Sequence, residues 1–498
     1  MTPERKRRIE FGDFQTPDEL ALSVCIRLSS MGIQPDIVVE PTCGTGAFIV
    51  SAAKIFQNAK HFFGFEINSS YLETLTSNLS GLETAEKISL EKTDFFSTDW
   101  KQKIGSMKGS LLVIGNFPWV TNTVQGCIGG INLPKKSNFL GFNGYDAITG
   151  SSNFDISEWM LIEVLRWFEN RPGDIAFLVK TSVARKILAY SEKQTMSIKE
   201  AFIIRIDAKK HFGASVEACL FIIRFGGILF QKNNDYMVFD GFNDIQGRKV
   251  GHRQGVMVSN LDAFESNQFI FGKSPQKWRS GVKHDASKVM ELTRIQDGYK
   301  NGLEEIIQIE NNYLYPLLKG SDVAGNKDWR DKFILVTQQY VGEQTDIICL
   351  RAPKTWAYLE SHSNYLDMRT SIVYKKNPRF SIFGIGDYAF RPWKIAICGL
   401  YKFLYFRLIG PIENRPVMFD DTVNYLSFNS EEEAKEVLEK LNSPAIGNLL
   451  SSLIFWDEKR PIKTKILNLV DWSRVDKKDF PLFSCTQTTT IGFPPMRD

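Results

Sequence analysis

The sequence predicts an α/β protein whose first half forms a mostly parallel sheet and whose second half is mixed α+β. In the first half, short apolar runs alternate with segments of helical periodicity, as a parallel sheet with covering helices requires. After Gly226 and Gly227 this alternation weakens, and short aromatic-rich strands take over. At 498 residues the chain is also too long for one domain of ordinary size. We therefore expect two domains, 1–230 and 231–498.

The strands expected in the first domain belong to one sheet, because each is a short apolar run bounded by turn residues. They are 36–39, 61–65, 88–90, 110–114, 174–179, 203–206 and 219–225. The expected helices are 47–56, 69–79 and 156–168, the last of them closed by Pro172 and Gly173. A polar stretch with six glycines, 121–153, is too long for a simple connection and is expected to be a functional lid or a disordered segment. In the second domain, Asn429 or Ser430 should cap a helix that starts with three glutamates, and another helix should start near Ile446.

Composition excludes several classes of protein. Hydrophobic residues make up 43% and charged residues 24% of the chain, which is typical of a globular protein and not of a disordered chain or a coiled coil. Charged residues interrupt the longest apolar runs, 218–230 and 395–409, so no membrane span is expected. The basic N-terminus lacks the apolar region of a secretory signal, which makes the cytoplasm the expected location. The seven cysteines and five histidines show no C-x-x-C or H-x-x-x-H spacing, so neither a metal site nor disulfides are expected.

A basic segment lies in the second domain, although the net charge of the whole chain is only +4. Residues 361–410 contain eight basic and two acidic residues, with aromatic residues interleaved among them. This mixture is expected where a surface meets the phosphates and bases of a nucleic acid, although a solvated face over an aromatic core would look the same. The candidate nucleic-acid contacts are Lys375, Lys376, Arg379, Arg391 and Lys394, with Lys135 and Lys136 in the glycine-rich stretch.

A glycine turn between the first strand and the first helix carries the first chemical motif. Residues 38–48 read Val-Val-Glu-Pro-Thr-Cys-Gly-Thr-Gly-Ala-Phe. Gly44 and Gly46 let the backbone of this turn approach a nucleotide-like ligand closely. A lone glycine turn of this kind is a weak signal.

Two carboxylates at neighbouring strand ends strengthen that signal. Glu66 ends the next strand, where a carboxylate can accept hydrogen bonds from ribose hydroxyls. Asp94 follows the third strand and suits an adenine amino group, with Phe95 beside it to cover the ring. The missing third glycine and the acidic Glu40 favour S-adenosylmethionine over a dinucleotide. Taken singly, Glu40 could instead complement the helix dipole, and Asp94 could instead form a turn.

The segment 111–119, Leu-Leu-Val-Ile-Gly-Asn-Phe-Pro-Trp, delivers an amide, a peptide carbonyl and an indole to the carboxyl edge of the sheet. Adenine's exocyclic amine is a poor nucleophile because its lone pair is delocalised into the ring. The Asn116 side-chain oxygen and the Phe117 carbonyl can hold both amino hydrogens and favour a pyramidal nitrogen that attacks a methyl group. Trp119 can stack on the base, a contact worth about 1–3 kcal/mol. The candidate catalytic residues are Asn116, Phe117, Pro118 and Trp119, unless Asn-x-Pro-Trp is merely a turn that ends a strand.

In their order along the chain, these motifs resemble those of amino-group DNA methyltransferases. The resemblance is to the gamma arrangement of the adenine-N6 enzymes of restriction–modification systems, with a TaqI-like architecture. A Phe-Gly-Asp-Phe-Gln-Thr-Pro segment at 11–17, the glycine turn, the two carboxylates and the Asn116 motif all precede a large C-terminal domain. The resemblance implies a Rossmann-like S-adenosylmethionine-dependent methyltransferase sheet, followed by a target-recognition domain that binds double-stranded DNA. It covers nearly the whole chain, strongly in the first half and loosely in the second.

The resemblance also implies roles for individual residues. Phe212 would stack on the face of the flipped base opposite Trp119, and residues 153–155 would begin the helix beside the pocket. Residues 315–322 resemble the family's P-L-L-x-G-x-D turn in the specificity domain. Thr16 and Pro17 would close over the methionine end of the cofactor. The implied cofactor-binding residues are Thr16, Pro17, Glu40, Thr42, Cys43, Gly44, Gly46, Glu66, Asp94 and Phe95.

The chain departs from the family pattern at one position, and further functions stay open. Phe117 replaces the first of two prolines in the usual tetrapeptide, so the backbone carbonyl is retained but a φ restraint is lost. The Asn-x-Pro-aromatic motif also resembles ribosomal RNA adenine dimethyltransferases, which makes RNA the second candidate substrate. The motif is also compatible with a protein-glutamine methyltransferase, with a degenerate DNA-binding module that lacks activity, and with methylation of cytosine N4. We expect action as a monomer on DNA, with a cognate restriction endonuclease encoded nearby as the expected partner.

Overall fold

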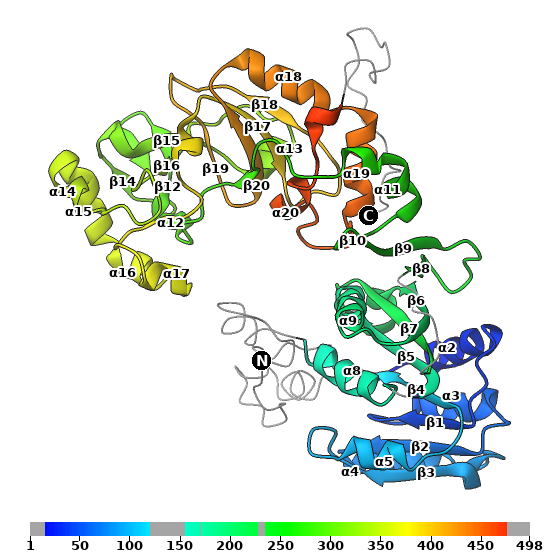
Figure 1. Ribbon diagram of the computed structural model, residues 1–498. Coiled ribbons are helices and arrows are strands. Elements are labelled where there is room, and N and C mark those ends of the chain that lie inside the picture. Colours follow the sequence, from blue (N-terminus) through cyan, green and yellow to red (C-terminus); the bar gives the residue numbers. More distant parts are fainter. Residues whose placement is uncertain (1–14, 120–154, 170, 228–234, 476–498) are drawn as a thin grey trace. The chain divides into compact units, whose positions relative to one another are not determined.

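The computed structural model describes residues 15–119, 155–169, 171–227 and 235–475 (Figure 1). The chain divides into two compact units, Met1–Leu261 and Asp262–Asp498. The boundary therefore lies later than the position expected near residue 230. Three further strands, β8 (Asp235–Phe239), β9 (Arg248–Arg253) and β10 (Val256–Val258), extend the sheet of the first unit. Apolar periodicity does not reveal this pairing, because it depends on backbone hydrogen bonds between distant segments.

The first unit contains one ten-stranded sheet in the order β10-β9-β8-β6-β7-β5-β4-β1-β2-β3. The strands from β3 to β5 in this order pair in parallel, whereas β7 pairs antiparallel with both β5 and β6. All seven strands expected from apolar runs are confirmed in this sheet. They are β1 (Ile37–Glu40), β2 (His61–Glu66), β3 (Ile88–Lys92), β4 (Leu111–Asn116), β5 (Pro172–Lys180), β6 (Ile198–Ile206) and β7 (Ala218–Gly226).

Three of the expected helices are confirmed as α3 (Ala47–Ile55), α4 (Ser69–Asn78) and α8 (Ile156–Arg166). Pro172 and Gly173 begin β5 instead of closing the preceding helix. Further helices of this unit were not among the expected elements. They are α2 (Asp18–Ser30), η1 (Ala85–Lys87), α5 (Trp100–Gly105), α9 (Thr181–Lys193) and α10 (Ala208–Phe212).

One core of the first unit lies between its sheet and two packed helices, α2 and α3. Leu28 of α2, Phe48 of α3 and Leu112 of β4 are fully or almost fully buried in this core. The packing holds the N-terminal segment of the described chain against the strands that carry the glycine turn and Asn116. Segments far apart in the sequence therefore meet at one edge of the sheet.

The second unit is mixed α+β and contains two smaller sheets, with the orders β11-β20-β17-β18 and β14-β13-β12-β16-β15-β19. Their strands pair antiparallel, except for the parallel pair β15 and β19. The strands are β11 (Arg279–Ser280), β12 (Glu291–Ile295), β13 (Gly298–Lys300), β14 (Ile306–Ile307), β15 (Leu314–Leu318), β16 (Lys332–Leu335), β17 (Trp393–Cys398), β18 (Arg407–Ile409), β19 (Met418–Phe419) and β20 (Val423–Phe428).

The helices expected near the C-terminus are both present. Ser430 caps α18 (Glu431–Leu441), because its hydroxyl accepts a hydrogen bond from the Glu433 N–H at 3.2 Å. The next helix is α19 (Pro444–Leu453). The remaining helices of this unit are short: α11 (Leu261–Asn267), whose first residue closes the first unit, η3 (Gln268–Ile270), α12 (Ser287–Met290), η4 (Asn311–Tyr313), α13 (Gly320–Ala324), α14 (Ile347–Arg351), α15 (Pro353–Ser361), α16 (Ser363–Asp367), α17 (Ile372–Lys375), η5 (Asp387–Phe390), α20 (Thr464–Leu467) and η6 (Trp472–Arg474).

In the described parts of the chain, none of the helices has the length and apolar character needed to cross a bilayer. The same residues contain no group of three or more His, Cys, Asp or Glu side chains arranged to hold a metal ion.

Candidate active site

Four of the predicted site residues lie at the ends of neighbouring parallel strands. Glu40, Glu66 and Asn116 are the last residues of β1, β2 and β4, and Asp94 follows β3 by two residues. Because parallel strands end at the same edge of a sheet, the fold brings these side chains together. The strand order β4-β1-β2-β3 places them in one row along that edge.

The glycine turn after β1 is held in place by Glu66. One carboxylate oxygen of Glu66 accepts a hydrogen bond from the Gly44 N–H at 2.9 Å, and the other accepts from the Asn68 N–H at 2.9 Å. Gly46 has a φ of +94°, and a Cβ atom there would lie 2.0 Å from Leu75 Cδ1. The turn therefore requires glycine for both its backbone conformation and its close approach to α4.

Two polar side chains, those of Thr42 and Gln15, lie at or near this turn. The Thr42 hydroxyl is buried and, among the residues that the structure describes, has no hydrogen-bond partner. Gln15, which precedes the predicted Thr16-Pro17 element, accepts hydrogen bonds from the Thr45 N–H at 3.2 Å and the Thr45 hydroxyl at 3.0 Å. The N-terminal segment thus contacts the glycine turn through Gln15.

Two predicted cofactor residues point into the protein interior. Glu40 is 3% exposed and accepts a hydrogen bond from the Ile49 N–H at 2.9 Å, at the start of α3. Burial raises the pKa of Glu40 well above its usual range, and the charge of Glu66 raises it further. Cys43 is also buried, and burial raises the pKa of its thiol. The Cys43 N–H donates to the Phe65 carbonyl at 2.8 Å, and the Cys43 carbonyl accepts from the Gly46 N–H at 2.8 Å, so Cys43 stabilises the turn.

The pair Asp94 and Phe95 behaves differently from what the motif suggests. Asp94 Oδ1 accepts a hydrogen bond from the Phe96 N–H at 2.9 Å, so the turn-forming role of Asp94 is present. Phe95 is 5% exposed, and its ring centroid lies 5.2 Å from Trp100 and 5.5 Å from Phe117. Phe95 is therefore part of an aromatic core, whereas the neighbouring Phe96 is only partly buried. The sequence does not show which of these two adjacent rings is buried, because both follow the carboxylate.

Asn116 contacts the N-terminal segment across 100 positions of sequence. Its side-chain amide donates to the Thr16 hydroxyl at 3.3 Å. Thr16 and Pro17 lie at the start of α2, where the Pro17 carbonyl accepts from two backbone N–H groups of the first turn. The predicted catalytic amide and the predicted cofactor-closing element are thus adjacent.

Phe117, the departure from the family tetrapeptide, is anchored by its ring. The side chain is 1% exposed and stacks on Phe177 of β5, with ring centroids 4.4 Å apart and an interplanar angle of 23°. Aromatic stacking together with burial restrains this residue, in place of the ring closure that proline would provide.

Trp119 and Phe212 contact each other directly instead of leaving a base-sized gap. Their ring centroids are 4.9 Å apart at an interplanar angle of 65°, an edge-to-face pair. The Trp119 indole N–H also donates to the Leu178 carbonyl at 3.2 Å. A base placed between the two rings would have to separate them.

Lys180 is a site residue that sequence reasoning missed. Its ammonium donates to the Trp119 carbonyl at 2.9 Å and to a carboxylate oxygen of Asp155 at 2.6 Å. Asp155 is buried and caps α8 by accepting from the Ser157 N–H. The available signal was a lysine that ends an apolar strand at the same carboxyl edge as Asn116. Asn153 and Phe154, which belong to the same motif, lie outside the described residues.

No family model matches the chain, but individual proteins do. The chain is 50% identical over 468 residues to the type II methyltransferase M.NspV of a Nostoc species, covering 94% of this chain and 97% of that protein. The chain belongs to the type II methyltransferases. A second relative, the type II methyltransferase M.VspI of a Vibrio species, is 25% identical over 203 residues, 40% of this chain and 44% of that protein.

A solved structure supports the fold of this type II methyltransferase. It is the type IIL restriction-modification enzyme MmeI in complex with DNA, matched at a TM-score of 0.57 with 12% identity, over 94% of this chain and 69% of that chain. The expected architecture, a methyltransferase sheet followed by a mixed α+β domain, is confirmed.

Several predicted nucleic-acid contacts of this methyltransferase have structural roles in the second unit. Lys394 is 1% exposed and donates to the carbonyls of Ala389 and Val417, so the prediction that it contacts phosphate is wrong. Lys394 lies in β17, where residues 394–398 are all buried. The composition of residues 361–410 does not show which of their basic side chains are buried. Arg379 is exposed but pairs with Asp367 at 2.9 Å.

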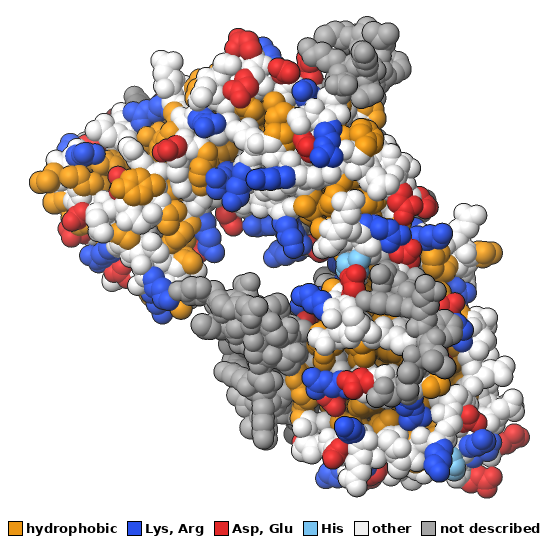
Figure 2. Space-filling model, viewed as in Figure 1, with side chains coloured by type: hydrophobic (Ala, Val, Ile, Leu, Met, Phe, Trp, Pro, Cys, Tyr) orange, Lys and Arg blue, Asp and Glu red, His pale blue; other side chains and the backbone are white. Residues whose placement is uncertain are grey.

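The remaining candidates differ in how accessible they are. Arg391 is half-buried and donates to the Ser427 carbonyl at 3.3 Å. Lys375 and Lys376 are exposed at the end of α17. Lys135 and Lys136 lie outside the described residues. Figure 2 shows lysine and arginine side chains grouped on the surface of the second unit in that view.

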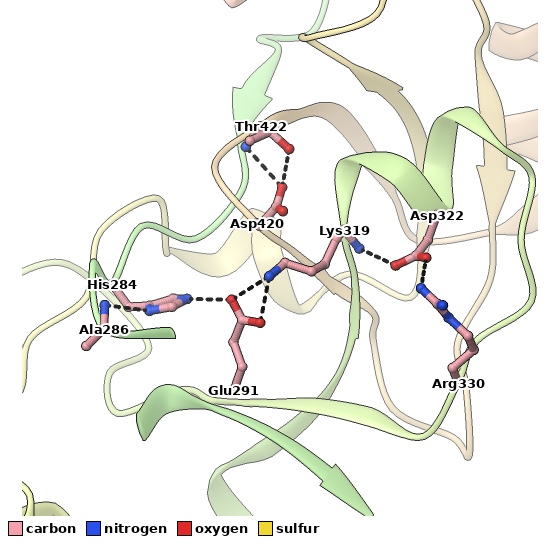
Figure 3. A network of polar contacts seen from close by, with 8 residues as sticks. All are labelled: His284, Ala286, Glu291, Lys319, Asp322, Arg330, Asp420 and Thr422. Carbon is pink, nitrogen blue, oxygen red and sulfur yellow. Dashed lines mark hydrogen bonds and ion pairs between the residues drawn. The ribbon is translucent and has the colours of Figure 1, made fainter. Parts of the chain in front are cut away.

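The turn at residues 315–322 is held by a polar network (Figure 3). Asp322 accepts from the Lys319 N–H at 3.0 Å and from the Arg330 guanidinium at 2.6 Å. The Lys319 ammonium binds both carboxylate oxygens of Glu291, at 3.0 and 2.7 Å. His284 lies on the other side of Glu291, with 3.5 Å between His284 Nε2 and Glu291 Oε1. The segment 315–322 therefore comprises the end of β15, Lys319 and the start of α13, and side-chain contacts connect it to β12.

Proposed function

We propose that this type II methyltransferase transfers a methyl group from S-adenosylmethionine to N6 of an adenine flipped out of duplex DNA. The observation that carries the proposal is the position of Asn116. It ends β4 within hydrogen-bonding distance of Thr16, in the same row of strand ends as Glu66 and Asp94. A nucleophile held there would face a cofactor bound on the glycine turn.

The residues at the strand ends fit S-adenosylmethionine. Gly44 and Gly46, both at positive φ, present backbone without side chains to a ligand. The buried Thr42 hydroxyl, which has no partner among the described residues, could bond to it. Glu66 and Asp94 would accept hydrogen bonds from the ribose hydroxyls and the adenine amino group. When bound, the cofactor supplies an electrophilic methyl group on a sulfonium.

The chain's own residues would prepare the target amine for attack. The Asn116 side-chain oxygen and the Phe117 carbonyl would accept the two N6 hydrogens, which favours a pyramidal nitrogen with an available lone pair. Packing of the Phe117 ring on Phe177 and the bond from Lys180 to the Trp119 carbonyl hold this peptide in place. After transfer, the excess N6 proton leaves to water. Base extrusion costs a few kcal/mol and is repaid by contacts in the site.

We assign target reading to the second unit and chemistry to the first. We further propose that the protein acts in the cytoplasm as a monomer on DNA, within a restriction–modification system that includes a cognate endonuclease. The 50% identity to a type II methyltransferase over almost the full length supports a role in a restriction–modification system. The charges of Lys375 and Lys376, exposed at the end of α17, support the assignment of DNA contact to the second unit.

Mass spectrometry of nucleosides tests the proposal in one experiment. DNA and ribosomal RNA from a host that expresses the wild-type protein are compared with those from hosts that express Asn116→Ala or the exposed control Asn78→Ala. We expect N6-methyladenine in DNA for the wild type and for Asn78→Ala, and nearly none for Asn116→Ala. N4-methylcytosine in DNA, or methylation of ribosomal RNA alone, would refute adenine in DNA as the target.

A further inference from the structure

The connection between β17 and β18 places three neighbouring large apolar side chains in solvent. Leu400, Tyr401 and Phe403 are 38%, 39% and 43% exposed. The rings of Tyr401 and Phe403 contact each other edge to face, with centroids 5.6 Å apart. Single exposed apolar residues are common, but a cluster on one loop tip marks an interaction site.

Hydrogen bonds and packing hold both ends of this loop, so its tip is exposed although the loop is well connected to the rest of the unit. The Gly399 N–H donates to the Thr422 carbonyl at 2.7 Å, and the Gly399 carbonyl accepts from the Ile462 N–H at 3.3 Å. A Cβ atom on Gly399 would lie 2.9 Å from the Ile462 carbonyl oxygen. At the other end of the loop, Phe406 is buried with its ring 5.8 Å from that of Trp278.

The network of Figure 3 supports the loop from the neighbouring turn. A Cβ atom on Gly320 would lie 2.5 Å from the Thr422 hydroxyl and 2.7 Å from Cys398 Sγ. Gly320 therefore packs against Cys398, which precedes Gly399, and against Thr422, whose carbonyl accepts from the Gly399 N–H. Arg407, which begins β18, donates to the Asp322 and Lys327 carbonyls at 2.9 and 3.0 Å. The segment 315–322 and the residues that follow it therefore contact the chain at both ends of the loop.

Three exposed cationic side chains lie on the loop or close to its base in sequence or space, and two of them form ion pairs with carboxylates. Lys402 is exposed between the two aromatic residues. Arg460 and Lys463 are exposed on either side of Ile462, the residue that bonds to Gly399. Their carboxylate partners are Asp421, at 3.4 Å from Arg460, and Glu458 for Lys463. An aromatic tip beside cationic side chains matches a nucleic acid, whose bases present apolar faces between phosphates.

We propose that the Leu400–Phe403 tip is a contact element for duplex DNA, in which Tyr401 and Phe403 pack against bases in a groove and Lys402 faces a phosphate. The proposal rests on the proposed function, because it names the part of the second unit that meets the substrate. Apolar contact with base edges or insertion between base steps is how such side chains read or deform DNA. A pre-fixed loop loses little conformational freedom on binding, which favours affinity.

The test uses the full chain and a duplex that contains the methylated site identified in the host. The double variant Tyr401→Ala/Phe403→Ala is compared with Phe269→Ala/Tyr340→Ala, a matched pair of aromatic residues that are 52% and 58% exposed elsewhere in the second unit. We expect the loop variant to bind the duplex about tenfold or more weakly, with S-adenosylmethionine affinity and turnover at saturating DNA close to wild type. The control pair should bind DNA as the wild type does.

The outcomes separate the two proposals. If the wild type neither binds nor methylates DNA, the proposed function fails irrespective of the loop. If the wild type methylates DNA and the loop variant binds it with unchanged affinity, the loop proposal is overturned. If the double variant does not fold, Lys402→Ala decides: a decrease of about one in the slope of log affinity against log salt supports the proposal, and an unchanged slope overturns it.

Discussion

At the scale of single residues, burial decides what a charged side chain can do. Glu40 and Lys394 were both predicted to face ligands, yet they are only 3% and 1% exposed. Burial raises the pKa of Glu40 and lowers the pKa of Lys394 to about 7. For Lys394 the residue type suggested binding, whereas its buried position makes it part of the structural framework.

Glu40 should make stability depend on pH. Because its folded pKa lies above its unfolded value, its favourable contribution is fully present below the unfolded pKa of about 4.3 and is lost as pH rises through the folded pKa. Glu40→Gln keeps an acceptor for the Ile49 N–H but cannot ionise. We expect the melting temperature of the variant to rise relative to wild type between pH 5 and pH 8, on the order of a few degrees. The exposed control Glu83→Gln should give a curve of melting temperature against pH that is parallel to that of the wild type. A parallel curve for Glu40→Gln would contradict this account.

Lys394 should matter for stability and not for DNA binding. Lys394→Met leaves the Ala389 and Val417 carbonyls without their donor, which costs about 1–3 kcal/mol of stability. The salt dependence of DNA affinity should stay unchanged, because a buried ammonium releases no counterions from phosphate. Thermal melting and binding titrations at several salt concentrations measure both effects. A smaller salt slope for Lys394→Met would show that the ammonium reaches DNA after all.

At the scale of elements, the end of β4 carries the predicted Asn116 motif, and aromatic residues from other segments hold Phe117 of this motif in place. Apolar runs sufficed to locate β1 to β7, because each strand contains apolar residues bounded by turn residues; β3 is the least apolar, with only Ile88 and Leu90. α9 and α10 were missed because basic residues interrupt their apolar faces, and α10 has only five residues. The support of Phe117 by Phe95 and Phe177 comes from three separate segments, so no local pattern could show it.

Phe117→Ala should therefore weaken both stability and catalysis. Removal of the buried ring leaves a cavity in the aromatic core, at a cost of about 3–5 kcal/mol. Loss of this anchor should also lower turnover, because the adjacent Asn116 amide and the Phe117 carbonyl are no longer held in position. Denaturant unfolding and turnover at saturating S-adenosylmethionine and DNA measure the two effects. Unchanged turnover in a destabilised variant would limit the ring to a packing role.

At the scale of the whole molecule, two units with separate cores suggest two separate binding functions. The first unit holds the row of strand ends, and the second holds the exposed aromatic loop and the lysines of α17. The chain division at Leu261 rather than near residue 230 assigns β8 to β10 to the first of these units.

Hydrogen exchange should reveal this separation. S-adenosylmethionine should increase protection around the glycine turn after β1, the end of β2 and the Asp94 turn, with little change in the second unit. At a cofactor concentration of 100 times its Kd, binding should stabilise the folded state that binds it by about 2.7 kcal/mol. Asp94→Ala should reduce this protection at a fixed cofactor concentration. Protection that appears only in the second unit would contradict the assignment of cofactor binding to the first.

Local sequence determined the strands β1 to β7, the helices α3, α4 and α8, the glycine turn and the positions of Glu66, Asp94 and Asn116 at strand ends, because strand periodicity and turn chemistry act over a few neighbouring residues. Tertiary structure alone decided which rings face the core, that Lys394 is buried, that β8 to β10 join the first sheet and that Lys180 holds the Trp119 carbonyl. These features depend on contacts between segments far apart in the chain. Burial and pairing of this kind arise only when distant elements pack, so they leave no periodic signal in the sequence itself.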